Sequence, residues 1–301
     1  MTRTNLTPLH ALLALAVMAV WGTNFVVIKV ALGHLPPLTF AALRFTFAVL
    51  PAIFFLKRPK VAWWNLAAYG VLIGVGQFGV LYIAMRSAIS PGLASLVVQT
   101  QVFFTIGLSM MLTGERVRGY QLAALALATA GLGWLVVHAN AEVTPLGLGL
   151  VLIAALSWAG GNTVARAAGP VNMLAYVVWA SLFSAPPLIA LALAFEGWPA
   201  MARGVTQANA MTWAAVLWQS IGNTLFGYAA WAWLLGRYPA ATISPLSLLV
   251  PVFGMAASAV FLGEPLSSWK LTAAMLVLSG LALNTLWPML QRRSARSMPA
   301  L

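Results

Sequence analysis

Residues 114–132 read GERVRGYQLAALALATAGL, and residues 263–281 read GEPLSSWKLTAAMLVLSGL. Aligned at a separation of 149 residues (263 − 114), the two stretches are identical at the positions of Gly114, Glu115, Leu122, Ala124, Leu127, Gly131 and Leu132. In addition, an early apolar run carries Trp21 and Asn24, and a later one carries Trp158 and Asn162. The two halves of the chain are therefore predicted to be copies of one unit.

The composition excludes a water-soluble globule. Of 301 residues, 62% are hydrophobic and 7% are charged, against roughly 45–50% and 25% in a soluble domain. A net charge of +12 would suggest a nucleic-acid partner in a soluble protein, but here we expect it to report membrane topology, with the lipid bilayer as partner. The absence of Cys excludes disulfides, thiol nucleophiles and cysteine metal sites.

The chain divides into apolar runs long enough for spanning helices, which need about 20 residues each. Continuous rather than alternating hydrophobicity excludes barrel strands. We predict an all-α membrane protein with ten spans: Leu9–Leu32, Pro37–Leu56, Val61–Met85, Pro91–Thr113, Gly119–Val137, Pro145–Ala165, Val171–Phe195, Met211–Leu235, Ala240–Leu262 and Leu271–Leu290.

Ten spans put both termini on one side, and the basic residues indicate which side. Three fall opposite the termini: Arg86, Arg203 and Lys270. Eleven fall on the side of the termini: Arg3, Lys57, Arg58, Lys60, Arg116, Arg118, Arg166, Arg237, Arg292, Arg293 and Arg296. Because basic loops are retained in the cytoplasm, both termini are predicted to be cytoplasmic.

Five spans in each half turn the second copy upside down relative to the first. We expect a first repeat at residues 1–140, a second at 141–290 and a basic tail at 291–301. Inverted repeats are typical of secondary transporters, whose substrate site lies between the repeats. The prediction is a carrier with a central cavity.

Several motifs resemble one transporter family over nearly the whole chain. They are WGTNFVVIK, LTFAALRF after two prolines, PAIFFLKRPKV, GLASLVVQTQVFFTI, the two Gly-Glu junctions and SPLSLLVPVFG. In this order they resemble the EamA family of the drug/metabolite transporter superfamily, above all bacterial inner-membrane exporters of O-acetylserine and cysteine and of aromatic amino acids. The resemblance implies ten helices in two inverted repeats around a central cavity, exporting small metabolites.

The first predicted span carries a polar stripe. Trp21, Phe25 and Lys29 recur every four residues, with Asn24 beside them. Facing lipid these polar groups would be costly, so Trp21, Asn24 and Lys29 are candidate substrate contacts. Lys29 has an alternative, because it lies near a helix end and its ammonium can reach the interface.

Other polar and aromatic residues within spans complete the candidate set. They are Gln77, Tyr82, Gln99, Trp158, Asn162 and Trp179, with Pro245 and Pro251 as gating positions in the ninth span. The alternative to substrate binding is a structural role, with the aromatic rings packing between helices and the amides forming hydrogen bonds between helices. The pair Asn223 and Thr224 is open to the same two readings.

Arg44 lies about eight residues into the second predicted span, and no acidic residue lies within any span. Its guanidinium is expected to meet backbone carbonyls, water, a lipid phosphate or a bound anion. Glu115 and Glu264 precede the fifth and tenth spans, where a carboxylate is expected to stabilise the start of the following helix.

The missing carboxylates bear on mechanism. Proton antiporters and cation carriers use an intramembrane carboxylate, so we expect export of a neutral or zwitterionic amino acid or related metabolite, by uniport. Alternatives are an exporter of drug-like compounds coupled to an ion gradient and, with less support, a channel. Without hydrolase, metal or phosphate-loop motifs we expect no enzyme, cofactor or metal; the sequence does not indicate an oligomeric state.

Overall fold

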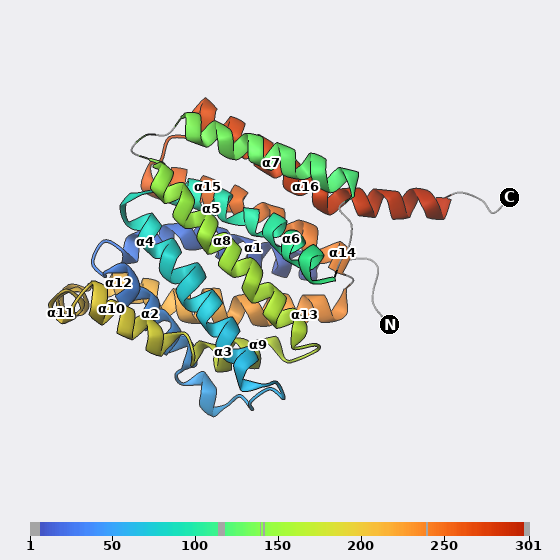
Figure 1. Cartoon of the computed structure of the whole chain (residues 1–301). Coiled ribbons are helices and arrows are strands. Elements are labelled where there is room, and N and C mark those ends of the chain that lie inside the picture. Colours follow the sequence, from blue (N-terminus) through green and yellow to red (C-terminus); the bar gives the residue numbers. More distant parts are fainter. Residues whose placement is uncertain (1–6, 114–117, 139, 141, 239, 298–301) are drawn as a thin grey trace.

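The computed structural model describes residues 7–113, 118–138, 140, 142–238 and 240–297. Over these residues the chain forms a bundle of helices, with isolated β-bridges as its extended structure. α1 begins and α16 ends at the right-hand end of the bundle in Figure 1. We call this the terminal end, and the opposite one the far end.

The first half of the chain has five helical segments, three of which change helix type along their length. They are α1 (Pro8–Ala31); α2 (Pro37–Val49) with the 3-10 turn η1 (Ala52–Phe54); α3 (Trp63–Val71), η2 (Leu72–Gly79) and α4 (Val80–Ser87); α5 (Pro91–Val97), η3 (Val98–Thr100) and α6 (Gln101–Thr113); and α7 (Gly119–Val137).

The second half repeats this order, with one additional short helix. Its elements are α8 (Pro145–Ala167); α9 (Met173–Ser181) and α10 (Ala185–Phe195); the additional α11 (Trp198–Gln207); α12 (Ala210–Leu217), η4 (Trp218–Phe226) and α13 (Gly227–Arg237); α14 (Ala240–Ile243), η5 (Ser244–Leu248) and α15 (Leu249–Leu262); and α16 (Ser268–Ser297).

Local sequence starts the first helix of each half in the same way. Thr7 and Thr144 are the N-caps of α1 and α8, and each is followed by a proline at the first helical position. The hydroxyl of Thr144 accepts a hydrogen bond from the amide of Gly147 at 2.9 Å, which satisfies one of the free donors of the first turn. Both halves therefore begin with the same cap.

The helix irregularities also recur at matching places. The third segment of each half contains a π-helical stretch, η2 in the first and η4 in the second. The fourth segment of each half contains a 3-10 stretch, η3 and η5. Because π-helical segments cluster at functional sites, this shared departure from the α-helix directs attention to the centre of the bundle.

Nine helical segments among the described residues are long and apolar enough to cross a membrane, which confirms nine of the predicted spans by length and composition. The remaining prediction, Met211–Leu235, falls in the continuous helix from residue 210 to residue 237. The middle of this helix carries four polar residues, Gln219, Ser220, Asn223 and Thr224.

The last helices of the two halves, α7 and α16, lie side by side along one edge of the bundle (Figure 1). A methyl group on Gly131 would lie 3.2 Å from the carbonyl oxygen of Ala273, and one on Gly280 would lie 2.5 Å from that of Ala124. Since Ala273 and Gly280 are the counterparts of Ala124 and Gly131, each contact is the copy of the other. In both contacts the numbers of the two contacting residues add to 404. Residue numbers therefore rise along one helix as they fall along the other, so the two helices are antiparallel.

Replacing Gly280 with Ala tests this close approach. The added methyl meets backbone atoms of α7, so α16 must shift, at a cost of about 1–3 kcal/mol. We expect a lower melting temperature for Gly280→Ala in detergent, followed by tryptophan fluorescence. The matched control is Gly133→Ala on the partner helix α7, because a methyl there meets nothing within 4 Å. Equal melting of the two variants would contradict the contact.

Candidate functional site

The side chain of Arg44 is the most deeply buried cation among the described residues, with 1% of the residue exposed. Its Nη1 donates to the hydroxyl of Tyr82 at 2.9 Å, and its Nη2 donates to Oγ1 of Thr224 at 3.2 Å. The guanidinium lies over the ring of Phe78, 3.5 Å from the ring centre. All these partners are neutral, and Nε has no hydrogen-bond partner among the described residues.

A chain of hydrogen bonds extends from Arg44 across the bundle. The Tyr82 hydroxyl donates to Oε1 of Gln219 at 3.2 Å, and Nε2 of Gln219 donates to Oδ1 of Asn24 at 2.6 Å. We call Asn24, Arg44, Tyr82, Gln219 and Thr224 the polar centre. Three of its members come from the first half and two from η4 of the second, so the polar centre joins the two halves.

The sequence of η4 explains how it supplies two of these groups. The hydroxyl of Thr224 donates to the carbonyl of Gln219, five residues earlier, at 2.9 Å, which satisfies a carbonyl in the wide π turn. The hydroxyl of Ser220 donates to the backbone carbonyl of Arg44 at 2.9 Å. The π-helical segment is therefore fastened to α2 at the residue that carries the buried cation.

Glycines bring the other π-helical segment close to the second half. A methyl group on Gly74 would overlap the side chain of Ser184, and the Ser184 hydroxyl donates to the carbonyl of Gly70 at 2.7 Å. This packing positions Phe78 under the Arg44 guanidinium. The break between α9 and α10, where Ser184 lies, precedes Pro186, which has no amide hydrogen to donate.

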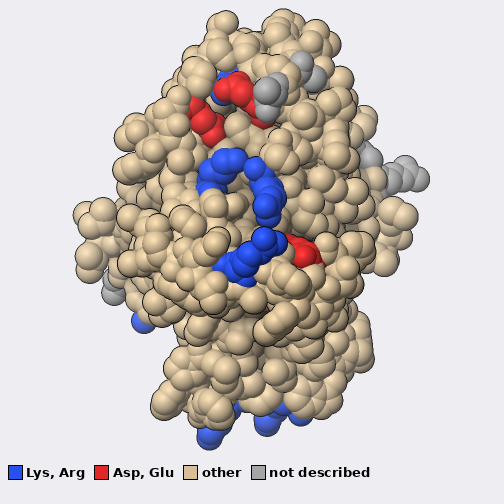
Figure 2. Space-filling model, turned by 90° about the vertical axis from the view of Figure 1, so that its left-hand side faces the viewer, with Lys and Arg blue, Asp and Glu red and all other residues tan. Residues whose placement is uncertain are grey.

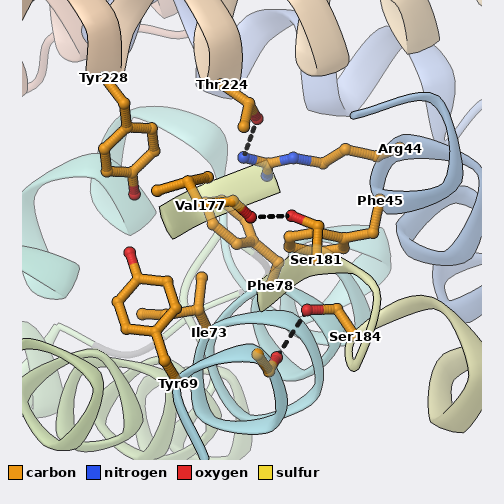
Figure 3. Close-up of a pocket in the computed structure, with 11 residues that line it drawn as sticks. Arg44, Phe45, Tyr69, Ile73, Phe78, Val177, Ser181, Ser184, Thr224 and Tyr228 are labelled. Atoms are coloured by element: carbon orange, nitrogen blue, oxygen red, sulfur yellow. Dashed lines mark hydrogen bonds between the residues drawn. The ribbon is translucent and has the colours of Figure 1, made fainter. Parts of the chain in front are cut away.

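A closed cavity lies beside the Arg44 guanidinium. It leaves ≈ 10 Å³ for the centre of a water molecule, so it has room for about one water. Figure 3 shows the hydroxyls of Tyr69 and Tyr228 facing each other across it, with Thr224 bonded to Arg44 at one side. The cavity is too small for an amino acid, and we call this arrangement of the centre closed.

Charged residues gather at the far end of the bundle, among uncharged surface (Figure 2). Glu196, which follows α10, accepts hydrogen bonds from the amides of Leu38 and Thr39 at 2.6 and 2.9 Å. This carboxylate of the second half stabilises the positive start of α2, the helix that carries Arg44. Lys270 pairs with Glu142 at 3.0 Å.

The hydrogen bond that the structure gives Glu264 is with the start of a different helix from the one that follows it. Its Oε2 accepts from the amide of Gly92 at 3.3 Å, at the start of α5. The chain turns away at Gly263, which adopts a left-handed conformation with φ 68°, and so the carboxylate reaches a helix of the other half. The corresponding Glu115 lies outside the described residues.

Two of the predicted site residues, Asn24 and Tyr82, belong to the polar centre. Gln77 and Gln99 are also buried, in η2 and η3, but outside its hydrogen-bond chain. Oε1 of Gln77 has no hydrogen-bond partner among the described residues.

Three further predicted residues lie in neighbouring contacts between helices. The indole of Trp21 donates to the carbonyl of Asn223 at 3.3 Å, and Asn162 donates to Oε1 of Gln101 at 3.1 Å. Trp158 packs against the main hydrophobic core. These contacts connect the predicted residues to helices of the bundle, and none of the three lines the cavity beside Arg44.

Lys29 and Trp179 lie towards opposite ends of the bundle. Nζ of Lys29 donates to the carbonyls of Met85 and Arg86 at the end of α4, at 3.3 and 3.2 Å. The indole of Trp179 donates to the carbonyl of Leu56, in the loop before α3, at 2.9 Å. Both side chains thus bond to backbone near helix ends, where free carbonyls are available.

Sequence reasoning found the importance of Arg44 but not its partners. It expected carbonyls, water, lipid phosphate or an anion, whereas the structure supplies the hydroxyls of Tyr82 and Thr224 and the ring of Phe78. Tyr69, Gln219 and Tyr228 were missed as site residues. The polar interruption of the helix from residue 210 to residue 237 was the available signal for Gln219.

Two parts of the chain, residues 9–137 and 145–286, match the EamA-like transporter family. The protein belongs to the EamA-like transporter family. It is therefore a multi-pass membrane protein and not an enzyme, as the sequence predicted.

Two relatives of this EamA-like transporter carry the name probable amino-acid metabolite efflux pump. The protein from Salmonella typhimurium is 41% identical over 94% of this chain and 97% of its own length. The protein from Escherichia coli K12 is 41% identical over 90% and 93%. A crystal structure 20% identical in sequence aligns with a TM-score of 0.63 over 92% of this chain and 96% of that one, and so shares its fold.

Tyr82 links Arg44 to Gln219 in the polar centre of this EamA-like transporter, so its hydroxyl is expected to stabilise the protein. Tyr82→Phe removes one hydroxyl and leaves both Nη1 of Arg44 and Oε1 of Gln219 without their partner, at a cost of about 1–3 kcal/mol. We expect a lower melting temperature in detergent. The control is Tyr120→Phe, at a partly exposed position on α7. Equal melting temperatures for the Tyr82 and Tyr120 variants would argue against the chain of hydrogen bonds.

Proposed function

We propose that this protein exports amino acids or related small metabolites across the bacterial inner membrane, by alternating access between two inverted five-helix halves. The observation that carries the proposal is the 41% identity, over nearly full length, to probable amino-acid metabolite efflux pumps. In this proposal the helix from residue 210 to residue 237 is the tenth span. Its polar groups are tolerated because they face the polar centre rather than lipid.

The antiparallel contact of α7 with α16 supports the inversion. Gly131 against Ala273 and Gly280 against Ala124 are equivalent contacts on two antiparallel helices, which is the arrangement a two-fold axis in the membrane plane would produce. The polar centre is assembled from both halves, as expected for a substrate site at their junction.

Charge supports cytoplasmic termini. The Glu residues that the structure describes, Glu142, Glu196 and Glu264, all contact helix starts or cations at the far end. By contrast, the guanidinium of Arg58, in the loop before α3, lies over Trp63, and that of Arg237, at the end of α13, lies over Trp233, each 3.9 Å from the ring centre. In this proposal the cationic terminal end faces the cytoplasm.

The proposed mechanism is uniport. No Asp or Glu lies in the predicted spans, so no carboxylate is available there to carry a proton. In the proposal the substrate contacts include Asn24, Tyr82, Gln77 and Gln99. Of the other sequence candidates, Trp21, Trp158 and Asn162 shape the surrounding wall. Lys29 and Trp179 bond to backbone towards the two ends of the bundle.

Counterflow in proteoliposomes tests this function. Vesicles are loaded with one unlabelled amino acid, and uptake of the same labelled compound is followed for a panel of amino acids, with and without a proton gradient. We expect saturable, transient accumulation of at least one compound without a gradient, because exchange through an alternating-access carrier needs only substrate on both sides.

The possible outcomes separate the alternatives. Exchange of no amino acid in sealed, folded preparations would overturn the substrate proposal. Accumulation that requires the proton gradient would replace uniport with coupled export, and flux that neither saturates nor shows counterflow would favour a channel. Protein-free vesicles serve as the control for passive leak of each compound through the lipid.

The ninth span is the proposed gating element. Pro245 lies in η5 and Pro251 is buried in α15, and the 3-10 stretch at η5 bends the helix where proline removes backbone donors. We expect the double variant Pro245→Ala, Pro251→Ala to slow counterflow by several-fold while the melting temperature stays near that of the wild type. Pro199→Ala, at the exposed start of α11, is the control; unchanged flux in the double variant would count against gating.

A further inference from the structure

The Arg44 guanidinium lacks a counter-charge. Its contacts are two hydroxyls and an aromatic ring, and no carboxylate of the described residues contacts it. Burying a charge without an opposite charge is costly, so neutral hydrogen bonds stabilise the cation only in part. An anion bound beside Arg44 would supply the missing charge.

The guanidinium has an unused hydrogen-bond donor and lines a cavity. Nε of Arg44 is buried and has no hydrogen-bond partner among the described residues, and Arg44 lines the closed cavity. Across this cavity lie the hydroxyls of Tyr69 and Tyr228, which point toward each other (Figure 3). Hydroxyls and a guanidinium are hydrogen-bond donors, the groups that a carboxylate needs.

The two tyrosines come from different halves. Tyr69 is on α3 and Tyr228 is on α13. Separation of the two halves would therefore part the hydroxyls and enlarge a cavity that now has room for about one water. Substrate access and exposure of the Arg44 guanidinium are then consequences of the same movement.

We propose that Arg44, with the hydroxyls of Tyr69 and Tyr228, forms a subsite for the carboxylate of the transported molecule. This inference rests on the proposed function and specifies its substrate class: a compound with a free carboxylate. The subsite forms when the halves separate, and in the closed state the two tyrosines fill it.

Two pairs of compounds test the subsite. The first pair is the amino acid that the wild-type protein exchanges fastest and its carboxamide, for example L-serine and L-serinamide, compared as competitors in counterflow. The second pair is propionate and propionamide, compared as stabilisers of the detergent-solubilised protein against heat, with chloride as the control for ionic strength. The second pair has no amino group, so it distinguishes a simple carboxylate from an amino acid.

In the wild-type protein we expect the carboxamide to be a weaker competitor than the amino acid, by a factor of about ten or more. The reason is that the carboxamide loses charge-assisted hydrogen bonds. In Arg44→Gln this preference is expected to fall to nearly one. Arg44→Lys keeps the charge without the planar fork and should retain an intermediate preference. Arg203→Gln is the control, because Arg203 is exposed and bonds within its own helix.

The results separate the subsite from the proposed function. If the wild type exchanges amino acids but accepts the carboxamide equally well, the subsite is wrong and the export function stands. If no amino acid exchanges but propionate stabilises the wild type more than propionamide, and Arg44→Gln abolishes that difference, the subsite stands and the function is wrong.

An Arg44 variant that weakens all competitors equally would reveal a purely structural role. If Arg44→Gln does not fold, the wild-type comparison and Arg44→Lys decide.

Discussion

The pairing of a buried guanidinium with neutral groups from both halves organises this structure. Arg44 reaches across the junction to Thr224, and Ser220 of the same π-helical segment bonds back to the Arg44 carbonyl. A charge inside a bundle surrounded by lipid must keep its hydrogen bonds, so the halves cannot separate here without new partners for Arg44. Closure of the cavity and stability of the cation are therefore linked.

The fold was predictable because its determinants are local and repeated. Apolar length gave nine of the spans, and the shared Gly-Glu stretches predicted two copies of one unit. The helix containing Gln219 and Thr224 was also predicted as a span from its apolar run, but its composition does not single it out as a lipid-crossing segment in the structure. Its polarity has meaning only when Arg44 and Asn24, far away in sequence, are seen beside it.

The site was predictable in part. Asn24 and Tyr82 were selected because polar groups within a span are costly unless they face the interior, and both join the polar centre. The same reasoning could not distinguish them from Lys29, whose long side chain bonds to the carbonyls that end α4. It also could not anticipate π-helical stretches, because the glycines of residues 74–79 read equally well as a packing face.

The contact between α7 and α16 also limits how the molecule can move. Each helix meets the backbone of the other where a glycine removes the side chain, and the two meeting points are seven residues apart along each helix. Sliding by one residue would bring larger side chains against those carbonyls, so translation along the common axis is blocked while a small rocking motion is not. This edge of the bundle is consequently suited to be the stationary pivot, leaving displacement to the helices around the buried cation.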